Sequence, residues 1–197
     1  MGSEFITYLR LGLHHITDVR GYDHILFIAA LTVPYRLSDW KQLLWLVTSF
    51  TLGHSVTLAL ATMDLIRLSP SIVEPAIGAT ILLTGLAAFA SVGRDDRAVR
   101  RGWQVGRYLM AAGFGLIHGL GFSNYLRSLL GEGEGLALPL FSFNVGLEVG
   151  QLLIVSAILA IGIGVERMLR VERRYWVGAV SVVVAVLGGS MLVERLR

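Results

Sequence analysis

The stretch RYWVGAVSVVVAVLGGSMLVE, residues 174–194, has no charged residue between Arg174 and Glu194. An apolar run of about 20 residues is the length that crosses the hydrocarbon core of a bilayer as an α-helix. The rest of the chain has the same character, because 54% of its 197 residues are hydrophobic and only 16% are charged. Soluble domains carry roughly 25% charged residues. The sequence therefore predicts a helical integral membrane protein.

Hydropathy predicts about six spanning helices. We expect an all-α, polytopic transmembrane helix bundle that forms a single domain over residues 6–197, in which short loops make consecutive helices neighbours. Residues 6–18 form a short amphipathic segment before the first span, and it either lies in the interface or re-enters the bundle. The first span is short and can borrow length from this segment. The predicted spans are 21–36, 40–63, 71–92, 103–124, 137–166 and 174–194.

The start of the chain contributes nothing to the functional interpretation. Residues 1–5, MGSEF, resemble a cloning scar, and we exclude them. We expect no signal peptide, because charged residues and histidines interrupt the first apolar stretch. The sequence shows no convincing internal repeat, so it does not favour an inverted-repeat transporter.

The absence of cysteine restricts the chemistry of any site. It excludes disulfides, thiolate metal sites and cysteine nucleophiles, so a metal ion would be held by imidazole and oxygen. The net charge of +3 does not indicate nucleic acid here, because arginine and lysine in a membrane protein report topology first. The expected partners are the lipid bilayer and a divalent metal ion, and a homo-oligomer is left open.

Arginine and lysine are unequally divided between the two sides of the predicted bundle. One side carries eleven of the 17, and the positive-inside rule places it in the cytoplasm. Both termini are then periplasmic, in a bacterial inner membrane. Glu132 and Glu134 fall in an outer loop, and residues 94–101 form a cytoplasmic loop without a site. The eleven are Arg36, Lys41, Arg94, Arg97, Arg100, Arg101, Arg107, Arg167, Arg170, Arg173 and Arg174.

This topology brings the buried polar residues to similar depth in the outer half of the bundle. Ionisable groups in a bilayer are costly, and they persist when they face the bundle interior and find partners. A shared divalent ion is one partner that satisfies several imidazoles and carboxylates at once, and such ligands suit Ni, Zn, Fe or Co. The predicted metal ligands are His15, Asp23, His24, His54, His118 and Glu148.

Four motifs contain these residues, and each has a structural alternative. In GYDH, residues 21–24, Asp23 is a metal ligand, an acceptor that orients an imidazole, or a helix cap. His15 reaches the site only if segment 6–18 folds back, and His14 points to another helix face. In LGHS, residues 52–55, the hydroxyl groups can bond between helices, whereas we favour His54 as a ligand.

The other two motifs lie in the fourth and fifth predicted spans. In FGLIHGLGF, residues 114–122, close packing explains the glycines but not His118. In FNVGLEVGQ, residues 143–151, Asn144, Glu148 and Gln151 stand at i, i+4 and i+7 and share one helix face. Such a stripe indicates a site or pathway lining, or a hydrogen-bond network between helices. Glu74 starts the third span, where the helix dipole also favours a carboxylate.

At these motifs the sequence resembles the HupE/UreJ family of small bacterial membrane proteins. It is similar to the branch with a GYDH-LF opening, a GHS second motif, an FGLIHGLGF helix and an FN-x-G-x-E-x-GQ helix. The resemblance covers nearly the whole chain after residue 5. It implies an accessory protein of hydrogenase or urease systems and a secondary permease for nickel or a related ion. The better-known nickel-linked branch has a shorter His-to-Asp-His spacing and a second histidine pair, where this chain has only His118.

Two principal functions follow. The first is a metal permease. The alternative is a zinc-dependent intramembrane hydrolase near the outer interface, in which imidazoles and a carboxylate leave one zinc position open to activate water. Its catalytic residues would be Ser55, Asn144 and Glu148, with Asp23 or Glu74 as other candidates for the general base. A third interpretation is a structural or sensory subunit with a satisfied polar network and no metal.

Overall fold

The computed structural model describes residues 2–93, 104–129 and 135–197. Within these ranges the protein has seven α-helices, one 3-10 turn and no strand, so the predicted all-α class is confirmed. The predicted loop at 94–101 and the acidic residues Glu132 and Glu134 lie outside the described residues. The elements are α1 (Gly2–Thr17), α2 (Asp23–Thr32), the 3-10 turn η1 (Leu37–Asp39), α3 (Trp40–Thr62), α4 (Pro70–Ala90), α6 (Gln104–Leu129), α7 (Ala137–Met168) and α8 (Arg173–Arg195).

Several helices are long enough to cross a membrane. Among the described residues, four segments combine the necessary length and apolar character: Leu37–Thr62, Pro70–Ala90, Ala137–Met168 and Arg173–Arg195. The chain therefore forms a multi-pass helical bundle, but the predicted count of six spans is not confirmed. Helix α6 is long, yet its glycines and polar residues keep it outside this group. Helix α2 has only ten residues, about half of what a span needs.

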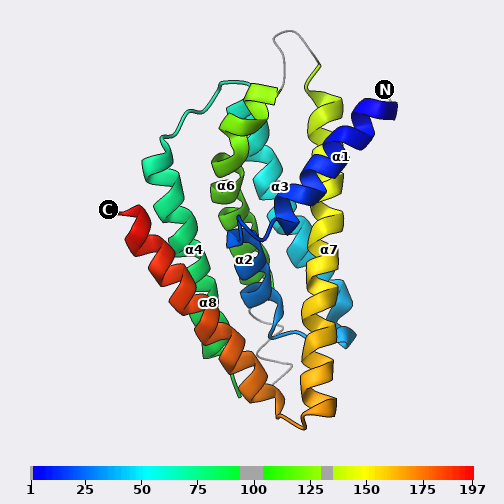
Figure 1. The fold of residues 1–197 in the computed structure, drawn as a ribbon, viewed down its shortest axis with the longest axis vertical. Helices are drawn as coiled ribbons and strands as arrows, with labels where there is room; N and C mark the ends of the chain where they lie inside the picture. The colour runs from blue at the N-terminus through cyan, green and yellow to red at the C-terminus, as the bar shows by residue number, and fades with distance from the viewer. Residues whose placement is uncertain (1, 94–103, 130–134) are drawn as a thin grey trace.

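The predicted first span, 21–36, contains the ten-residue helix α2, and the predicted segment 6–18 lies mostly in the separate helix α1. Residues 18–22 form a bend between α1 and α2, and α2 begins near the middle of the bundle (Figure 1). It ends before Pro34, which has no backbone N–H to continue a helix. Residues 2–5, expected to be a cloning scar, form the start of α1, and that expectation stays a prediction.

Three pairs of helices build the bundle: α1 with α7, α3 with α6, and α4 with α8 (Figure 1). Glycines allow the first two pairs to approach closely. A Cβ atom on Gly12 of α1 would lie 2.0 Å from the carbonyl oxygen of Phe143 in α7. A Cβ atom on Gly115 of α6 would lie 2.2 Å from the carbonyl oxygen of Phe50 in α3. The same contact therefore occurs in both pairs.

The glycines of the partner helices, α7 and α3, also make equivalent contacts. A Cβ atom on Gly146 of α7 would lie 2.0 Å from the carbonyl oxygen of Leu9, and one on Gly53 of α3 would lie 2.0 Å from that of Ala112. Leu9 is three residues before the contacting glycine of α1, and Ala112 is three residues before that of α6. Helix α1 thus packs on α7 as α6 packs on α3.

The third pair follows the same rule. Gly12 and Gly115 are 103 residues apart in the sequence, and so are Gly85 of α4 and Gly188 of α8. A Cβ atom on Gly85 would lie 2.8 Å from the backbone nitrogen of Ala185, and one on Gly188 would lie 2.6 Å from that of Leu82. Ala185 and Leu82 are also 103 residues apart. Helices α4 and α8 are therefore equivalent and pack on each other symmetrically.

These correspondences divide the bundle into two repeats, α1–α3–α4 and α6–α7–α8. Helices α1 and α7 run in one direction along the bundle, whereas α3 and α6 run in the other (Figure 1). The two repeats are therefore inverted with respect to each other. Helix α2 is inserted into the first repeat and lies at the centre, where it contacts α4, α7 and α8.

The prediction of no internal repeat is wrong for a physical reason. The repeats share a packing register and little sequence. Residues 12–15 and 115–118 keep the spacing Gly-Leu-x-His, but elsewhere apolar residues replace one another freely because any of them fills a membrane helix. The register becomes evident only from which glycine contacts which carbonyl oxygen.

Candidate metal centre

Three histidines from three helices meet inside the bundle. His15 lies in the last turn of α1, His24 is the second residue of α2, and His54 is in the second half of α3. One ring nitrogen from each lies within 4.8 Å of the others. Segment 6–18 does fold back, because α1 packs along α7 and carries His15 to this position. The three residues are called the histidine triad below.

Four ring nitrogens of the triad are buried and have no hydrogen-bond partner among the residues that the structure describes. They are Nε2 of His15, Nε2 of His24, and both Nδ1 and Nε2 of His54. Leaving such a group unsatisfied costs about 1–3 kcal/mol, so native proteins rarely keep several together. A cation that accepts their lone pairs would remove this cost. The arrangement therefore has the chemistry of a metal site made of neutral imidazoles.

Asp23 fixes which nitrogen of His24 is free. Its Oδ1 lies 2.9 Å from Nδ1 of His24 and also accepts from the His24 backbone N–H. A carboxylate accepts, so Nδ1–H donates and the lone pair is on Nε2, inside the triad. Carboxylates in contact with histidine ligands orient metal sites in this way. Among the roles predicted for Asp23, this geometry matches that of an acceptor that orients an imidazole.

His118 lies next to the triad. Its ring centroid is 5.0 Å from that of His24, while His15 is 4.8 Å from His24. Thr80 Oγ1 donates to the carbonyl of Ile77, so Nε2–H of His118 donates to Thr80 Oγ1 at 3.0 Å. The buried Nδ1 of His118 then carries a lone pair and has no partner. Thr80, which the sequence did not single out, is the residue that sets this tautomer.

Phenylalanines enclose the four imidazoles. The ring of Phe122 lies 3.9 Å from that of His15, and Phe27 lies 5.2 Å from His118. Phe143 and Phe50 complete the wall, at 5.7 Å from His15 and 5.4 Å from His118 respectively. Sequence reasoning missed these residues, although Phe122 and Phe143 belong to two of the motifs, and Phe27 and Phe50 lie within three residues of the other two. They exclude water and leave the imidazoles without alternative hydrogen-bond partners.

Comparison with known proteins agrees with these motifs. The family model described as "HupE / UreJ protein" matches residues 1–195. The chain belongs to the HupE/UreJ family. The family is associated with functions related to nickel and cobalt transport. No curated protein and no solved structure matches the chain.

In this HupE/UreJ protein, Glu148 is not part of the triad. Thr48 Oγ1 donates to its Oε1 at 2.6 Å, and one turn away Thr51 Oγ1 donates to Oε1 of Gln151 at 2.7 Å. Two of the three residues in the polar stripe of α7, Glu148 and Gln151, therefore accept from α3. This is the interhelical network that stood as the alternative to a pathway lining.

The other candidate catalytic residues of the HupE/UreJ chain bond within their own helices. Ser55 Oγ donates to the carbonyl of Thr51 at 2.6 Å, and Asn144 Nδ2 donates to that of Leu140 at 2.8 Å. Asn144 Oδ1 is buried without a partner. Neither hydrogen bond involves a histidine of the triad, and the catalytic role of these residues stays a prediction.

His14 and Glu74, the weaker site candidates in the sequence, lie at the surface of this HupE/UreJ bundle. His14 is exposed, on another face of α1 from His15, as expected for neighbours in a helix. Glu74 is also exposed, and its backbone carbonyl accepts from Arg195 Nη1 at 3.1 Å. Neither residue takes part in the histidine triad.

Proposed function

We propose that this HupE/UreJ protein is a permease for a divalent metal ion, nickel or a related ion, and that His15, His24 and His54 bind it as the transported substrate. One observation carries the proposal: a buried nitrogen of each of three imidazoles lies within 4.8 Å of the others, and the buried nitrogens have no hydrogen-bond partner among the described residues. Imidazole suits nickel, cobalt, zinc and iron. The nickel and cobalt association of the family favours the first two.

The inverted repeats support transport over hydrolysis. Many secondary transporters consist of inverted repeats, with the substrate site near the bilayer midplane and formed by interrupted helices. The triad has this setting, because His15 and His24 flank the break between α1 and α2 and His54 belongs to the equivalent pair α3–α6. Rocking one repeat against the other would open the site to either side.

His118 provides a second position for the ion in this proposal. By the 103-residue offset, His118 stands in the second repeat where His15 stands in the first. Both rings flank His24, at 4.8 Å and 5.0 Å. His24 and His54 can therefore stay bound while His15 is exchanged for His118. Binding that is shared between positions lets an ion leave as well as enter.

The hydrolase alternative has no support of this kind, since Ser55, Asn144 and Glu148 bond to other partners.

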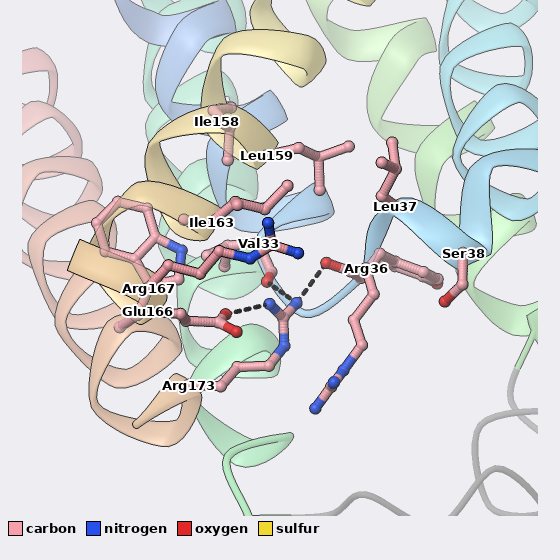
Figure 2. A pocket seen from close by; sticks show the side chains of 13 residues that line it. Val33, Arg36, Leu37, Ser38, Ile158, Leu159, Ile163, Glu166, Arg167 and Arg173 are labelled. Atoms are coloured by element: carbon pink, nitrogen blue, oxygen red, sulfur yellow. Dashed lines mark hydrogen bonds and ion pairs between the residues drawn. The ribbon is translucent and has the colours of Figure 1, made fainter. Parts of the chain in front are cut away.

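The proposal also includes the membrane topology: a bacterial inner membrane, six crossings completed by α1–α2 and α6, and both termini periplasmic. It is supported by Arg36, Arg167 and Arg173, which lie together at one end of the bundle (Figure 2).

The test is metal content measured by mass spectrometry on full-length protein purified without a histidine tag. We expect a single ion per chain, lost in His54→Ala and kept in the matched control His14→Ala, which removes an exposed imidazole. Reconstituted vesicles loaded with a metal-sensitive dye then measure uptake. Protein that binds no ion after nickel, cobalt and zinc are offered would overturn the proposal, as would bound ion without uptake.

A further inference from the structure

A pocket of about 240 Å³ lies between α7, the start of α8 and the connection from α2 to α3 (Figure 2). It is at the arginine-rich end of the bundle, away from the histidine triad. Its lining is charged on one side and apolar on the other. The lining residues on which the argument depends are Ile158, Leu159, Ile163, Glu166, Arg167 and Arg173.

Arg173 forms a fixed floor for this pocket. Its Nη1 donates to Glu166 Oε1 at 2.7 Å, and its Nη2 donates to the carbonyl oxygens of Val33, at 3.1 Å, and Tyr35. These carbonyls follow the C-terminal end of α2, where a cation is favoured by the helix dipole. Arg173 therefore offsets the charge of Glu166, and it connects α8 to α7 and to the end of α2.

Arg167 carries the positive charge that is not compensated. Figure 2 shows its guanidinium extending across the pocket, close to that of Arg173. Within the part of the chain that the structure describes, no hydrogen bond or ion pair is found for Arg167. Burial raises the pKa of Tyr35, so this phenol stays neutral and adds no negative charge. The pocket thus places Arg167 beside the Arg173–Glu166 ion pair, whose charges offset each other.

The opposite side of the pocket is apolar and faces the membrane-spanning part of α7. Ile158, Leu159 and Ile163 lie one to two turns before Glu166 and point toward the guanidinium groups (Figure 2). Trp176 of α8 packs against Gly162, where a Cβ atom would lie 2.8 Å from the indole Nε1. Tryptophan is enriched where the hydrocarbon core meets the headgroups, which fits a pocket at this level.

We propose that the pocket binds an anionic phospholipid, with the headgroup phosphate against Arg167 and Arg173 and an acyl chain along Ile158, Leu159 and Ile163. A planar guanidinium pairs with phosphate through parallel charge-assisted hydrogen bonds. Basic pockets between membrane helices take anionic headgroups in this way. Inorganic phosphate shares the polar half of this chemistry, but it leaves the apolar wall uncovered. The inference does not depend on metal transport.

The experiment is native mass spectrometry of the full chain in mild detergent, with phosphatidylglycerol or phosphatidylcholine added. We expect one phosphatidylglycerol to stay bound in the wild type and in Arg170→Gln, the matched control that removes a charge at the same end outside the pocket. Arg167→Gln should weaken retention by about tenfold or more, the effect of losing a charged hydrogen bond. Unchanged thermal unfolding verifies that each variant is folded.

Two outcomes would overturn the proposal. Equal retention of phosphatidylcholine, or equal loss in Arg167→Gln and Arg170→Gln, would show that the charge of the pocket selects nothing. Displacement of the lipid by inorganic phosphate alone would show that the apolar wall contributes nothing and that the ligand is free phosphate. Retention that excess phosphate does not affect supports the lipid.

Discussion

At the scale of single residues, the site is defined by which ring nitrogens are already used. Asp23 and Thr80 each accept from one nitrogen of a histidine, so that the other nitrogen of His24 and of His118 faces the centre with its lone pair. His54 keeps both nitrogens free. Asp23 and Thr80 therefore act as positioning residues, and each gives a separate test.

Asp23→Asn should keep the fold and weaken metal binding. An amide can donate to Nδ1 of His24 as well as accept from it, so it no longer forces the lone pair onto Nε2. Loss of such a carboxylate typically costs about 10- to 100-fold in metal affinity. Titration of the purified protein with nickel measures the change. Asp18→Asn is the control, because the nearby carboxylate of Asp18 accepts, among the described residues, from the Arg20 backbone N–H. An equal loss there would contradict the assignment.

Thr80→Val should destabilise the protein by about 1–3 kcal/mol, because the buried Nε2–H of His118 loses its acceptor. Thr84→Val removes a hydroxyl one turn further along α4 that bonds only to the carbonyl of Thr80, and it should cost much less. Thermal unfolding in detergent compares the two. Equal effects would mean that the bond between Thr80 and His118 does not hold the imidazole.

At the scale of helices, backbone contact rather than side-chain interlocking determines the pairs. Gly53 and Gly146 occupy equivalent positions, and each lets a carbonyl oxygen of the neighbouring helix come to where a Cβ atom would be. Such contacts leave no room for adjustment, because both sides are backbone. This rigidity fixes α1, which carries His15, against α7, and α3, which carries His54, against α6.

Gly53→Ala should therefore be poorly tolerated. Its Cβ would lie 2.0 Å from the carbonyl oxygen of Ala112, and separating α3 from α6 should cost at least about 1–3 kcal/mol. Gly113→Ala, where nothing lies within 4 Å of the added atom, should be neutral or stabilising by up to about 1 kcal/mol through helix propensity. Melting temperatures of the two variants test this, and a reversed order would disprove the glycine contacts.

At the scale of the whole molecule, the two ends of the bundle differ in their arginine content. The connections from α2 to α3 and from α7 to α8 lie at one end, and the connection from α3 to α4, the end of α6 and the start of α7 lie at the other (Figure 1). The proposed topology puts the first end in the cytoplasm, following the arginines.

The lack of native cysteine makes this orientation directly measurable. The side chains of Leu65, just after α3, and Met168, the last residue of α7, are exposed. The ends of α3 and α7 lie at opposite ends of the bundle (Figure 1). In intact cells, Leu65→Cys should react with a membrane-impermeant maleimide, whereas Met168→Cys should react only after the membrane is opened. The reverse pattern would place the arginine-rich end outside and make the proposed topology wrong.

The sequence predicts the membrane helices well and their relations poorly. Apolar runs and isolated histidines are visible in a linear chain, so the helical class and the gathering of His15, His24 and His54 could be expected. The boundary between segment 6–18 and span 21–36 could also be expected, but the packing of α1 on α7 could not, because short loops predict that consecutive helices are neighbours. Thr80 could not be singled out either, because a threonine in a membrane helix most often bonds to its own backbone.

The pairing of helices from different repeats has a consequence for synthesis on the ribosome. Each of the pairs α1–α7 and α3–α6 takes one helix from each repeat, so α1 emerges more than 100 residues before α7. Until then the glycine face around Gly12 has no neighbour, and α1 is too short and too polar to remain alone in the hydrocarbon. The histidine triad can therefore form only late in translation, when α7 draws α1 into the bundle, which leaves half-made chains without a metal-binding site.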